Sequence, residues 1–283
     1  MVTSKRYVVA GEMLAIRQSE IRRDADGFFW LTGPGSPKTY RHPSYADVAV
    51  VHARGSFEHH LTESADSYEG IEDKIDDAMG GKDGDEPRDP PAGVILEIDS
   101  RGGVVAGLNA TIERIRNMRK ARGIPLVAFV NEMAASAAYG LACACDEIIC
   151  PASGIVGSIG TISTMFSVVK QDEMAGVDVR LITSGARKSD GHPHTAITDG
   201  AEAAERDRVM KLAQSFFEIA SSARGIPVKK IAAMQAGIYL GPDAKDRRLV
   251  DSVLSLDDVA RALSKVRSGV QAKGNLTDRR ATT

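Results

Sequence analysis

The sequence predicts an α/β protein with a mainly parallel sheet. Strand-like and helix-like segments alternate along residues 93–182, and the strand-like segments are short runs rich in valine and isoleucine. A chain of 283 residues, 43% of them hydrophobic, is long enough to bury one large core. We therefore expect a principal domain over residues 46–268, preceded by an extension at 1–45 and followed by a disordered tail at 269–283.

The first elements are expected in the N-terminal third of the chain. Residues 1–45 combine charge with a breaker run at 33–37 (GPGSP), which predicts a hairpin-like extension and a loop. Residues 47–52 form the first expected core strand, and residues 68–79 the first helix. Glycine, proline and charge are mixed over 80–91, and this composition predicts an exposed, mobile connection.

The alternating part follows directly. Buried strands are expected at 94–98, 125–130, 147–150 and 177–182, and helices at 107–122 and 136–144. Apolar residues at i, i+3 and i+4 then predict one long amphipathic helix over 200–223, with two more helices at 228–235 and 256–266.

Charge and hydropathy exclude two classes of partner. The 36 basic and 38 acidic residues give a net charge of −2, so no overall field favours nucleic acid or an anionic membrane. The apolar run at the N-terminus is interrupted at Gly11 and Glu12, and no segment approaches the ~20 apolar residues of a membrane span. We expect no nucleic-acid partner, no membrane span and a cytoplasmic location.

The cysteines and histidines predict no metal site. Cys143, Cys145 and Cys150 are an odd set without histidine ligands nearby, and we interpret them as reduced core residues. The four histidines before residue 61 offer no metal spacing beyond one adjacent pair. The residues indicate neither a metal nor a cofactor.

Ser136 lies in a run of small residues at 133–138 (MAASAA). A helix that begins directly after a strand here would point the backbone N–H of Ala137 at a substrate carbonyl beside the Ser136 hydroxyl. Ser136 is therefore a candidate nucleophile, which requires a base within hydrogen-bond reach. A serine among alanines can also be a helix cap or serve tight helix packing.

The glycine pair Gly102 and Gly103 follows an expected strand and precedes an expected helix. Without Cβ atoms, the main chain can approach a ligand closely, so the backbone N–H of Gly103 is a candidate oxyanion donor. A simple strand-to-helix turn is the alternative. A phosphate-binding loop is disfavoured because the pattern GxxxxGK[ST] is absent.

Lys188 ends the segment 183–188 (TSGARK) and is the candidate base. A lysine acts as a base only when its amine is neutral, and an ordinary lysine, with a pKa of about 10.4, is almost entirely charged at pH 7. Burial favours the neutral form. Arg187 would disfavour a second positive charge, whereas Asp190 would stabilise the ammonium if it faces the same way.

Neighbouring residues add two interpretations. Ser158 could hold the neutral amine by a hydrogen bond, or it could be an ordinary turn serine. His192 and His194 offer a rival Ser–His pair with Ser136. We rank that pair lower because its loop is polar and interrupted by a proline.

Four motifs follow one another along the chain, at 99–103 (DSRGG), 134–137 (AASA), 157–160 (GSIG) and 184–188 (SGARK). In order and spacing they resemble those of the signal peptide peptidase A family of Ser–Lys peptidases. The segment 190–193 (DGHP) is similar to the phage branch of that family, the head-maturation proteases of lambda-type phages. The resemblance extends from about Tyr45 to Leu263.

The resemblance implies a ClpP/crotonase-like α/β fold and a defined set of roles. Ser136 would be the nucleophile, Lys188 the general base, Ser158 the hydrogen-bond partner of that lysine, and the N–H groups of Gly103 and Ala137 the oxyanion donors. It implies no cofactor, protein or peptide substrates, and a homo-oligomer whose subunits complete the active site together. For the phage branch it implies scaffold and portal-associated partners inside the procapsid, in a bacterial host.

The function expected from these observations is a serine endopeptidase that acts through an acyl-enzyme, in a phage or prophage, on scaffold or minor capsid proteins. Three alternatives remain open: a soluble bacterial protease of the signal-peptide-peptidase type, a crotonase-type acyl-CoA enzyme, and a head protein that has lost turnover. Crotonase-type enzymes typically need a carboxylate in the pocket, where this chain has a hydroxyl.

Overall fold

The computed structural model describes residues 39–60, 66–80 and 90–265, together with four short strands near the N-terminus. These strands form two antiparallel pairs, and they are β1 (Arg6–Val9) with β2 (Glu12–Ala15) and β3 (Ile21–Arg23) with β4 (Phe29–Leu31). Such pairs agree with the hairpin-like extension expected there. The tail expected at 269–283, and all but the ends of the connection expected at 80–91, lie outside the described residues.

A nine-stranded sheet forms the centre of the molecule. Its main path runs in the order β12-β11-β9-β8-β6-β5, with β10 and β13 beside β9 and with β7 beside β6. The strands are β5 (Thr39–His42), β6 (Tyr45–Glu58), β7 (Asp66–Ser67), β8 (Gly93–Gly103), β9 (Leu126–Ala135), β10 (Glu147–Cys150), β11 (Ile155–Gly157), β12 (Ile238–Leu240) and β13 (Ser252–Val253).

The central pairs of the sheet are parallel, and antiparallel pairs occur at its two ends. β6, β8, β9 and β11 pair in parallel, as do β9 with β10 and β10 with β13. β5 with β6 and β11 with β12 are antiparallel. The expected α/β class with repeated βα units and a mainly parallel sheet is therefore confirmed.

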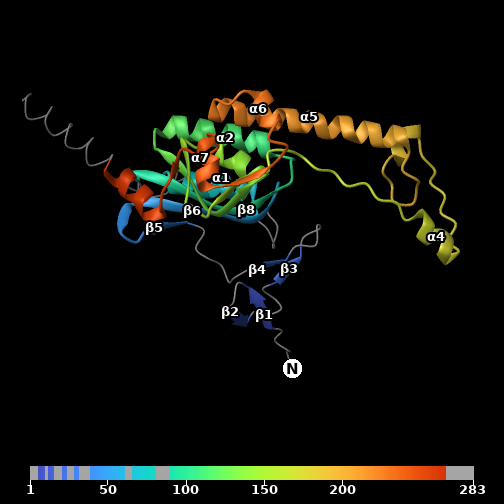
Figure 1. Ribbon diagram of the computed structural model, residues 1–283, viewed down its shortest axis with the longest axis horizontal. Helices are drawn as coiled ribbons and strands as arrows, with labels where there is room; N and C mark the ends of the chain where they lie inside the picture. Colours follow the sequence, from blue (N-terminus) through green and yellow to red (C-terminus); the bar gives the residue numbers. More distant parts are fainter. Residues whose placement is uncertain are drawn as a thin grey trace, which may run out of the picture.

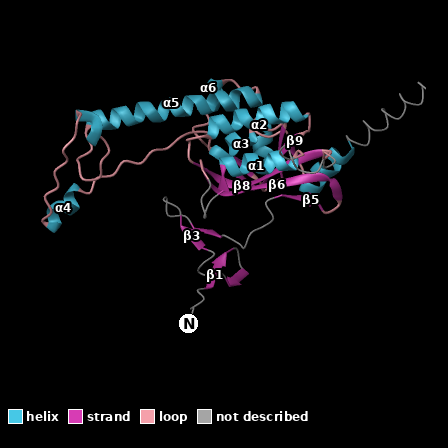
Figure 2. Cartoon of the chain, turned by 180° about the vertical axis from the view of Figure 1, so that it is seen from behind, coloured by secondary structure: helices cyan, strands magenta, loops and turns pink. Residues whose placement is uncertain are grey.

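Helices cover one face of the sheet, as Figure 2 shows for α1, α2, α3 and α5. The helices are α1 (Tyr68–Ala78), α2 (Leu108–Arg122), α3 (Ala137–Ala142), α4 (Val169–Ala175), α5 (Asp199–Arg224), α6 (Val228–Ala232) and α7 (Gly241–Asp246), with a 3₁₀ turn η2 at Ala186–Ser189. The last segment, residues 256–265, is helical and packs on the opposite face, because Val259, Ala260 and Leu263 join the cluster around Ile95.

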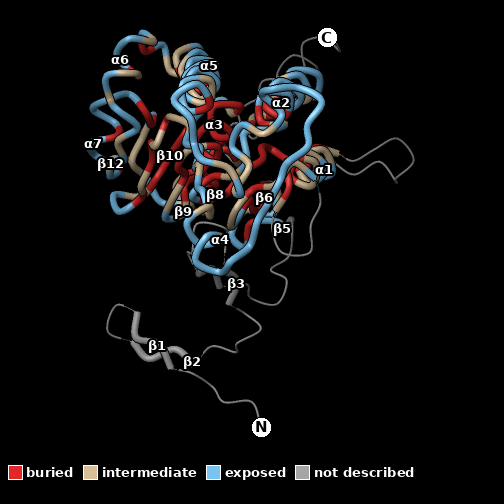
Figure 3. Tube along the Cα trace, turned by 90° about the vertical axis from the view of Figure 1, so that its right-hand side faces the viewer, coloured by how far each residue is buried: buried red, intermediate tan, exposed pale blue. Residues whose placement is uncertain are grey.

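Burial on both faces explains the continuous apolar run of β8. Val94, Leu96 and Ile98 pack against the helices, whereas Ile95 faces the smaller cluster on the other side. Figure 3 shows the buried residues gathered in the layer between the sheet and the helices. Strand β8, in the middle of the sheet, thus gives rigid support to the loop that follows its carboxyl end.

Glu97 is a buried carboxylate on the second face of the sheet, 2% exposed. One of its oxygens accepts hydrogen bonds from Arg54 on β6 at 2.8 Å and from Asn131 on β9 at 2.6 Å. His52 lies 3.3 Å from the other oxygen, and burial lowers the pKa of that imidazole. Glu97 therefore connects three neighbouring strands shortly before they end.

Most expected elements are confirmed, and three need correction. The strand expected at 177–182 is wrong, because no strand pairs with this segment among the residues that the structure describes, and Ile182 is 99% exposed. The helix expected at 136–144 spans only Ala137–Ala142, since β9 continues to Ala135. The helix expected at 228–235 ends earlier, at Ala232.

Residues 161–198, called the arm below, project from the body between β11 and α5 (Figure 1). Every residue of the arm is described and none is buried. Large apolar side chains on it stay exposed, including Phe166 at 59% and Met174 at 83%. The apolar segment that predicted a strand at 177–182 therefore lies on this arm, and no strand of the described residues pairs with it.

Candidate active site

Ser136 occupies the sharp junction between β9 and α3. Its φ is +52° and its ψ is −127°, a conformation that costs a residue with a side chain about 1–3 kcal/mol. Its N–H donates to the carbonyl of Gly157 at 2.9 Å, and its carbonyl accepts from the N–H of Tyr139 at 2.9 Å. Neighbouring structure thus holds the strained turn in place.

The alternative role of Ser136 as a helix cap does not apply. It stands at the N-cap position of α3, but its side chain accepts no capping hydrogen bond within the described part of the chain. The hydroxyl is therefore not engaged in holding the helix.

Small residues in α3 allow close packing against two longer helices. A Cβ on Gly140 would lie 3.2 Å from the ring of Phe216 on α5 and 3.3 Å from Leu108 on α2. The hydroxyl of Tyr139 donates to the carbonyl of Leu249 at 2.8 Å. These contacts fix the helix whose first residue is Ala137.

Gly102 and Gly103 end β8 directly beside Ser136. Gly102 has a φ of +117°, and a Cβ there would lie 2.8 Å from the Cβ of Ser136 and 2.9 Å from the carbonyl of Ala135. A Cβ on Gly103 would overlap the carbonyl oxygen of Phe57. Both positions therefore require glycine, one for the close approach to Ser136 and the other for the approach to β6.

Three of the five predicted site residues line one small cavity of about 30 Å³. They are Ser136, Ala137 and Gly103, which come from the ends of β9 and β8 and from the start of α3. Side chains of α2 and α5 form the wall opposite, among them Leu108, Asn109, Leu212, Ser215 and Phe216. The predicted nucleophile and both predicted oxyanion donors are thus brought together.

Ser158 ends the neighbouring strand at the same level. Gly157 of β11 is paired with Ala135 of β9, so Ser158 follows its strand as Ser136 follows the other. Ser158 also has a φ of +52°, and its N–H donates to the carbonyl of Gly237 at 2.9 Å. The two serines leave adjacent parallel strands, which are ordinarily about 4.8 Å apart.

Lys188 is not brought to Ser136 within one chain. It belongs to η2 on the arm, it is exposed, and it is not among the residues that line the Ser136 cavity in the described part of the chain. The burial expected for a neutral lysine is therefore missing in the single chain. His192 and His194 lie on the same arm, where His194 contacts Asp172 at 2.6 Å.

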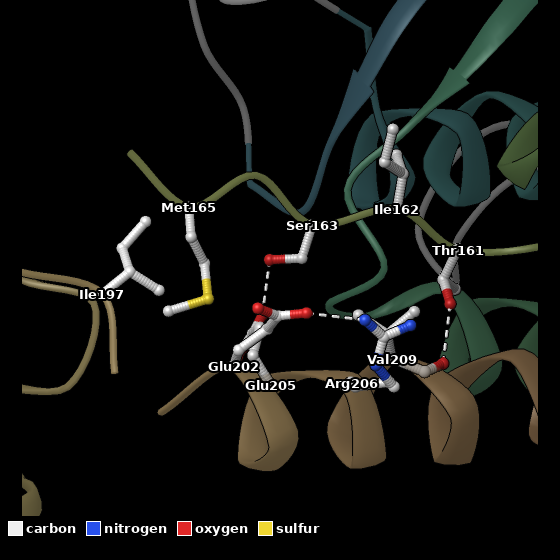
Figure 4. A pocket seen from close by; sticks show the side chains of 9 residues that line it. All are labelled: Thr161, Ile162, Ser163, Met165, Ile197, Glu202, Glu205, Arg206 and Val209. Carbon is white, nitrogen blue, oxygen red and sulfur yellow. Dashed lines mark hydrogen bonds and ion pairs between the residues drawn. The ribbon is translucent and has the colours of Figure 1, made fainter. Parts of the chain in front are cut away.

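A larger recess adjoins the small cavity, and no motif in the sequence indicated it. It has a volume of about 420 Å³ and lies between the base of the arm and the first half of α5. Figure 4 shows Ser163 pointing toward Glu205, and Glu202 beside Arg206. Thr161, whose hydroxyl donates to the carbonyl of Val209 at 2.8 Å, lines both cavities.

Burial raises the pKa of two thiols and one carboxyl group that line neither cavity. The three cysteines are free, and burial raises the pKa of Cys143 to about 12 and that of Cys150 to about 11. Burial also raises the pKa of Asp99 on β8, against the lowering effect of Arg54. No group of His, Cys, Asp or Glu in the described ranges is arranged to hold a metal ion.

None of the described helices combines the length and the apolar composition that crossing a membrane requires.

Comparisons with known proteins point to phage and protease sequences. The chain is 28% identical over 281 residues to the head-tail preconnector protein GP5 of Enterobacteria phage P21. This alignment covers 94% of this chain and 54% of the phage protein. It is 29% identical over 181 residues to capsid assembly protease C of Escherichia phage lambda, covering 64% of this chain and 40% of that one. The chain spans about half the length of these curated relatives.

One solved structure and one peptidase family also match this chain. A mutant form of ClpP1 from Listeria monocytogenes aligns with a TM-score of 0.45 at 13% identity, covering 75% of this chain and 94% of that one. The description of peptidase family S49 matches residues 118–271, just over half of the chain. This match includes Ser136, Ser158 and Lys188, and by it the chain belongs to peptidase family S49.

Proposed function

We propose that this protein is a serine endopeptidase whose nucleophile is Ser136. The observation that carries this proposal is the shared cavity of Ser136, Ala137 and Gly103. In acylation the Ser136 oxygen bonds to the substrate carbonyl carbon and loses its proton to a base. That proton then passes to the leaving amine as the peptide bond breaks. Water next attacks the acyl-enzyme and gives a proton to the base, which returns it to the Ser136 oxygen as the acyl group leaves.

The backbone N–H groups of Gly103 and Ala137 are the proposed oxyanion donors. Both residues line the cavity beside Ser136, and Ala137 is the first residue of α3, whose N–H has no partner within the helix. Donors fixed by strand ends and by a packed helix need no reorganisation when the oxyanion forms, which is what stabilises a transition state.

We propose that Lys188 is the base and that it is supplied by the arm of a second copy. Within one chain it is exposed on a projecting segment, whereas a base must reach the hydroxyl of Ser136. Exposed apolar side chains on the arm, such as Ile182 and Met174, fit contact with another subunit. Burial between subunits would also favour the neutral amine.

Ser158 is the proposed hydrogen-bond partner of that amine. It leaves β11 beside Ser136 and is half-buried, so a lysine that enters from the arm side would meet both hydroxyls. A hydroxyl that accepts from or donates to the neutral amine would hold it in line with the nucleophile.

The proposed substrates are proteins of a phage head during its assembly, in a bacterial host. This proposal is supported by the names of the phage relatives, which concern the head-tail connection and capsid assembly. The recess adjoins the Ser136 cavity and so offers room for substrate residues beside the scissile bond.

The experiment is covalent labelling and cleavage with matched variants. Wild type, Ser136→Ala and Lys188→Ala are treated with a fluorophosphonate probe and with a mixture of unfolded proteins. We expect labelling at Ser136 alone and cleavage by wild type only, with the circular dichroism spectrum unchanged in both variants. Cleavage by Ser136→Ala at the wild-type rate would overturn the proposal.

Mixing the two inactive variants tests the origin of the lysine. If Lys188 acts on the Ser136 of another copy, mixed assemblies contain some sites with both residues intact, and activity returns on mixing. No recovery after dissociation and reassembly of the mixture would show that each chain uses its own lysine.

A further inference from the structure

The arm is held in shape by polar contacts. No residue of α4 is buried, so apolar packing adds little to the conformation of the segment around it. The two sides of the arm meet where the N–H of Val168 donates to the carbonyl of Pro193 at 2.8 Å. They meet again where the Ser167 hydroxyl donates to the carbonyl of Thr195 at 2.7 Å.

One side-chain contact ties α4 to the segment that follows Lys188. Oδ2 of Asp172 lies 2.6 Å from Nδ1 of His194, and we call this contact the latch. The side chains of Asp172 and His194 are 17% and 40% exposed, compared with 73% and 84% for Asp178 and Arg180 farther along the arm. The latch is thus better shielded from water than the exposed ion pair between Asp178 and Arg180.

Local hydrogen bonds continue from the latch to Lys188. The residue after His194 is Thr195, whose hydroxyl oxygen lies 2.8 Å from the carbonyl oxygen of His192 and 3.3 Å from that of Ser189. Ser189 is the last residue of η2, the turn in which the N–H of Lys188 donates to the carbonyl of Gly185 at 3.0 Å. A continuous set of contacts therefore runs from α4 to the lysine.

We propose that Asp172 is a positioning residue for Lys188. Through His194 and Thr195 it fixes residues 185–195 against α4, so that the lysine is presented to its target in one geometry. This inference rests on the proposed function, because it takes Lys188 to be the base. Displacing a reacting group by about 1 Å can cost on the order of 100-fold in rate, so loss of the latch slows acylation although no group leaves the cavity.

The test compares two asparagine substitutions on the same arm. Asp172→Asn removes the charge of the latch. Asp178→Asn removes the charge of the exposed ion pair with Arg180, at 2.8 Å, and among the described residues no hydrogen bond joins this pair to the Lys188 turn. For each variant the rate of fluorophosphonate labelling at Ser136 is measured, together with kcat, KM and the size of the assembly in solution. Lys188→Ala is the reference.

For Asp172→Asn we expect labelling and kcat to fall about tenfold or more, with KM and assembly size unchanged. For Asp178→Asn we expect both rates to stay within about twofold of wild type. Hydrogen exchange of the backbone amides at 185–195 should be faster in Asp172→Asn alone. In the pair Asp172→Asn and His194→Gln, the double variant should be no slower than the slower single variant.

Equal rates for Asp172→Asn and Asp178→Asn, with Lys188→Ala inactive, would overturn this inference and leave the proposed function intact. A change in KM or in assembly size that accounts for the whole effect would also overturn it, because the latch would then serve association. Labelling of Lys188→Ala at the wild-type rate would overturn the dyad itself, and the role of Asp172 with it.

Discussion

Ser136 and Ser158 leave adjacent parallel strands at the same register and with the same φ of +52°. The N–H of Ser136 donates to the carbonyl of Gly157, the residue just before Ser158, so the two turns are also joined by a hydrogen bond of 2.9 Å. Their relative position is set by the ladder between β9 and β11.

Ser158→Ala should lower kcat by about tenfold or more and leave KM nearly unchanged, since the hydroxyl would hold the base and not the substrate. Steady-state cleavage of a peptide measures both constants. Ser153→Ala, at an exposed serine in the loop before β11, is the control and should behave like wild type. An unchanged kcat in Ser158→Ala would remove this residue from the site.

Gly102→Ala should abolish fluorophosphonate labelling of Ser136. The new methyl group would lie 2.8 Å from the Cβ of Ser136, in a backbone conformation with φ of +117° that disfavours a side chain. Gly123→Ala is the control, because it also has positive φ but no atom within 4 Å of the new Cβ. It should cost only about 1 kcal/mol of stability and keep full labelling. Normal labelling of Gly102→Ala would show that the loop can move away from the serine.

Glu97→Gln should lower the free energy of unfolding by about 2 kcal/mol, because the buried carboxylate accepts one charge-assisted hydrogen bond from Arg54 and one hydrogen bond from Asn131. Urea unfolding followed by circular dichroism measures the change. Glu113→Gln, at an exposed position of α2, should change it by less than about 0.5 kcal/mol. Equal stability of the two variants would mean that the network contributes nothing.

The stability should fall as the pH is lowered from 7.5 to 5.5, in part because of His52. Burial lowers the pKa of His52 in the folded protein. The unfolded chain, with an ordinary histidine pKa of about 6.5, therefore binds the proton first as the pH falls. Above that pH both states are neutral and the contribution vanishes. Unfolding in urea at the two pH values, with His52→Gln for comparison, should show a smaller pH dependence in the variant. An equal dependence would exclude His52 as a cause.

Local patterns predicted most of the fold. The buried run at 94–98 and the i, i+3, i+4 pattern at 200–223 each mark one element, because strands covered on both faces and amphipathic helices leave a direct trace in composition. The strand expected at 177–182 failed for the opposite reason. Its apolar composition does not tell whether a neighbouring strand is present, and no described strand pairs with it, so its large apolar side chains stay exposed.

Part of the candidate site was predicted from local patterns, and the position of its lysine was not. Glycines and small residues indicated the loop of Gly102 and Gly103 and the turn at Ser136, since close approach of backbones demands them. The position of Lys188 relative to Ser136 could not be predicted, because it depends on the arm, and the arm is held by contacts between polar residues distant in sequence, such as Asp172 and His194. The recess could not be predicted either, because its α5 residues, 202, 205, 206 and 209, have ordinary helical spacing, which indicates one helix face but not a cavity beside it.

Strand β9 changes its neighbour on one side, from β10 at residues 127–129 to β11 at residues 133–135, and between these stretches Glu132 adopts a φ of +75°. The stretch of β9 that leads to Ser136 is therefore hydrogen-bonded to β11, the strand that leads to Ser158. Because the ladder between β9 and β11 joins the two strand ends directly, a displacement of the arm or of the outer strand β12 leaves that ladder in place. The distance between the Ser136 and Ser158 hydroxyls would therefore stay the same during such a displacement.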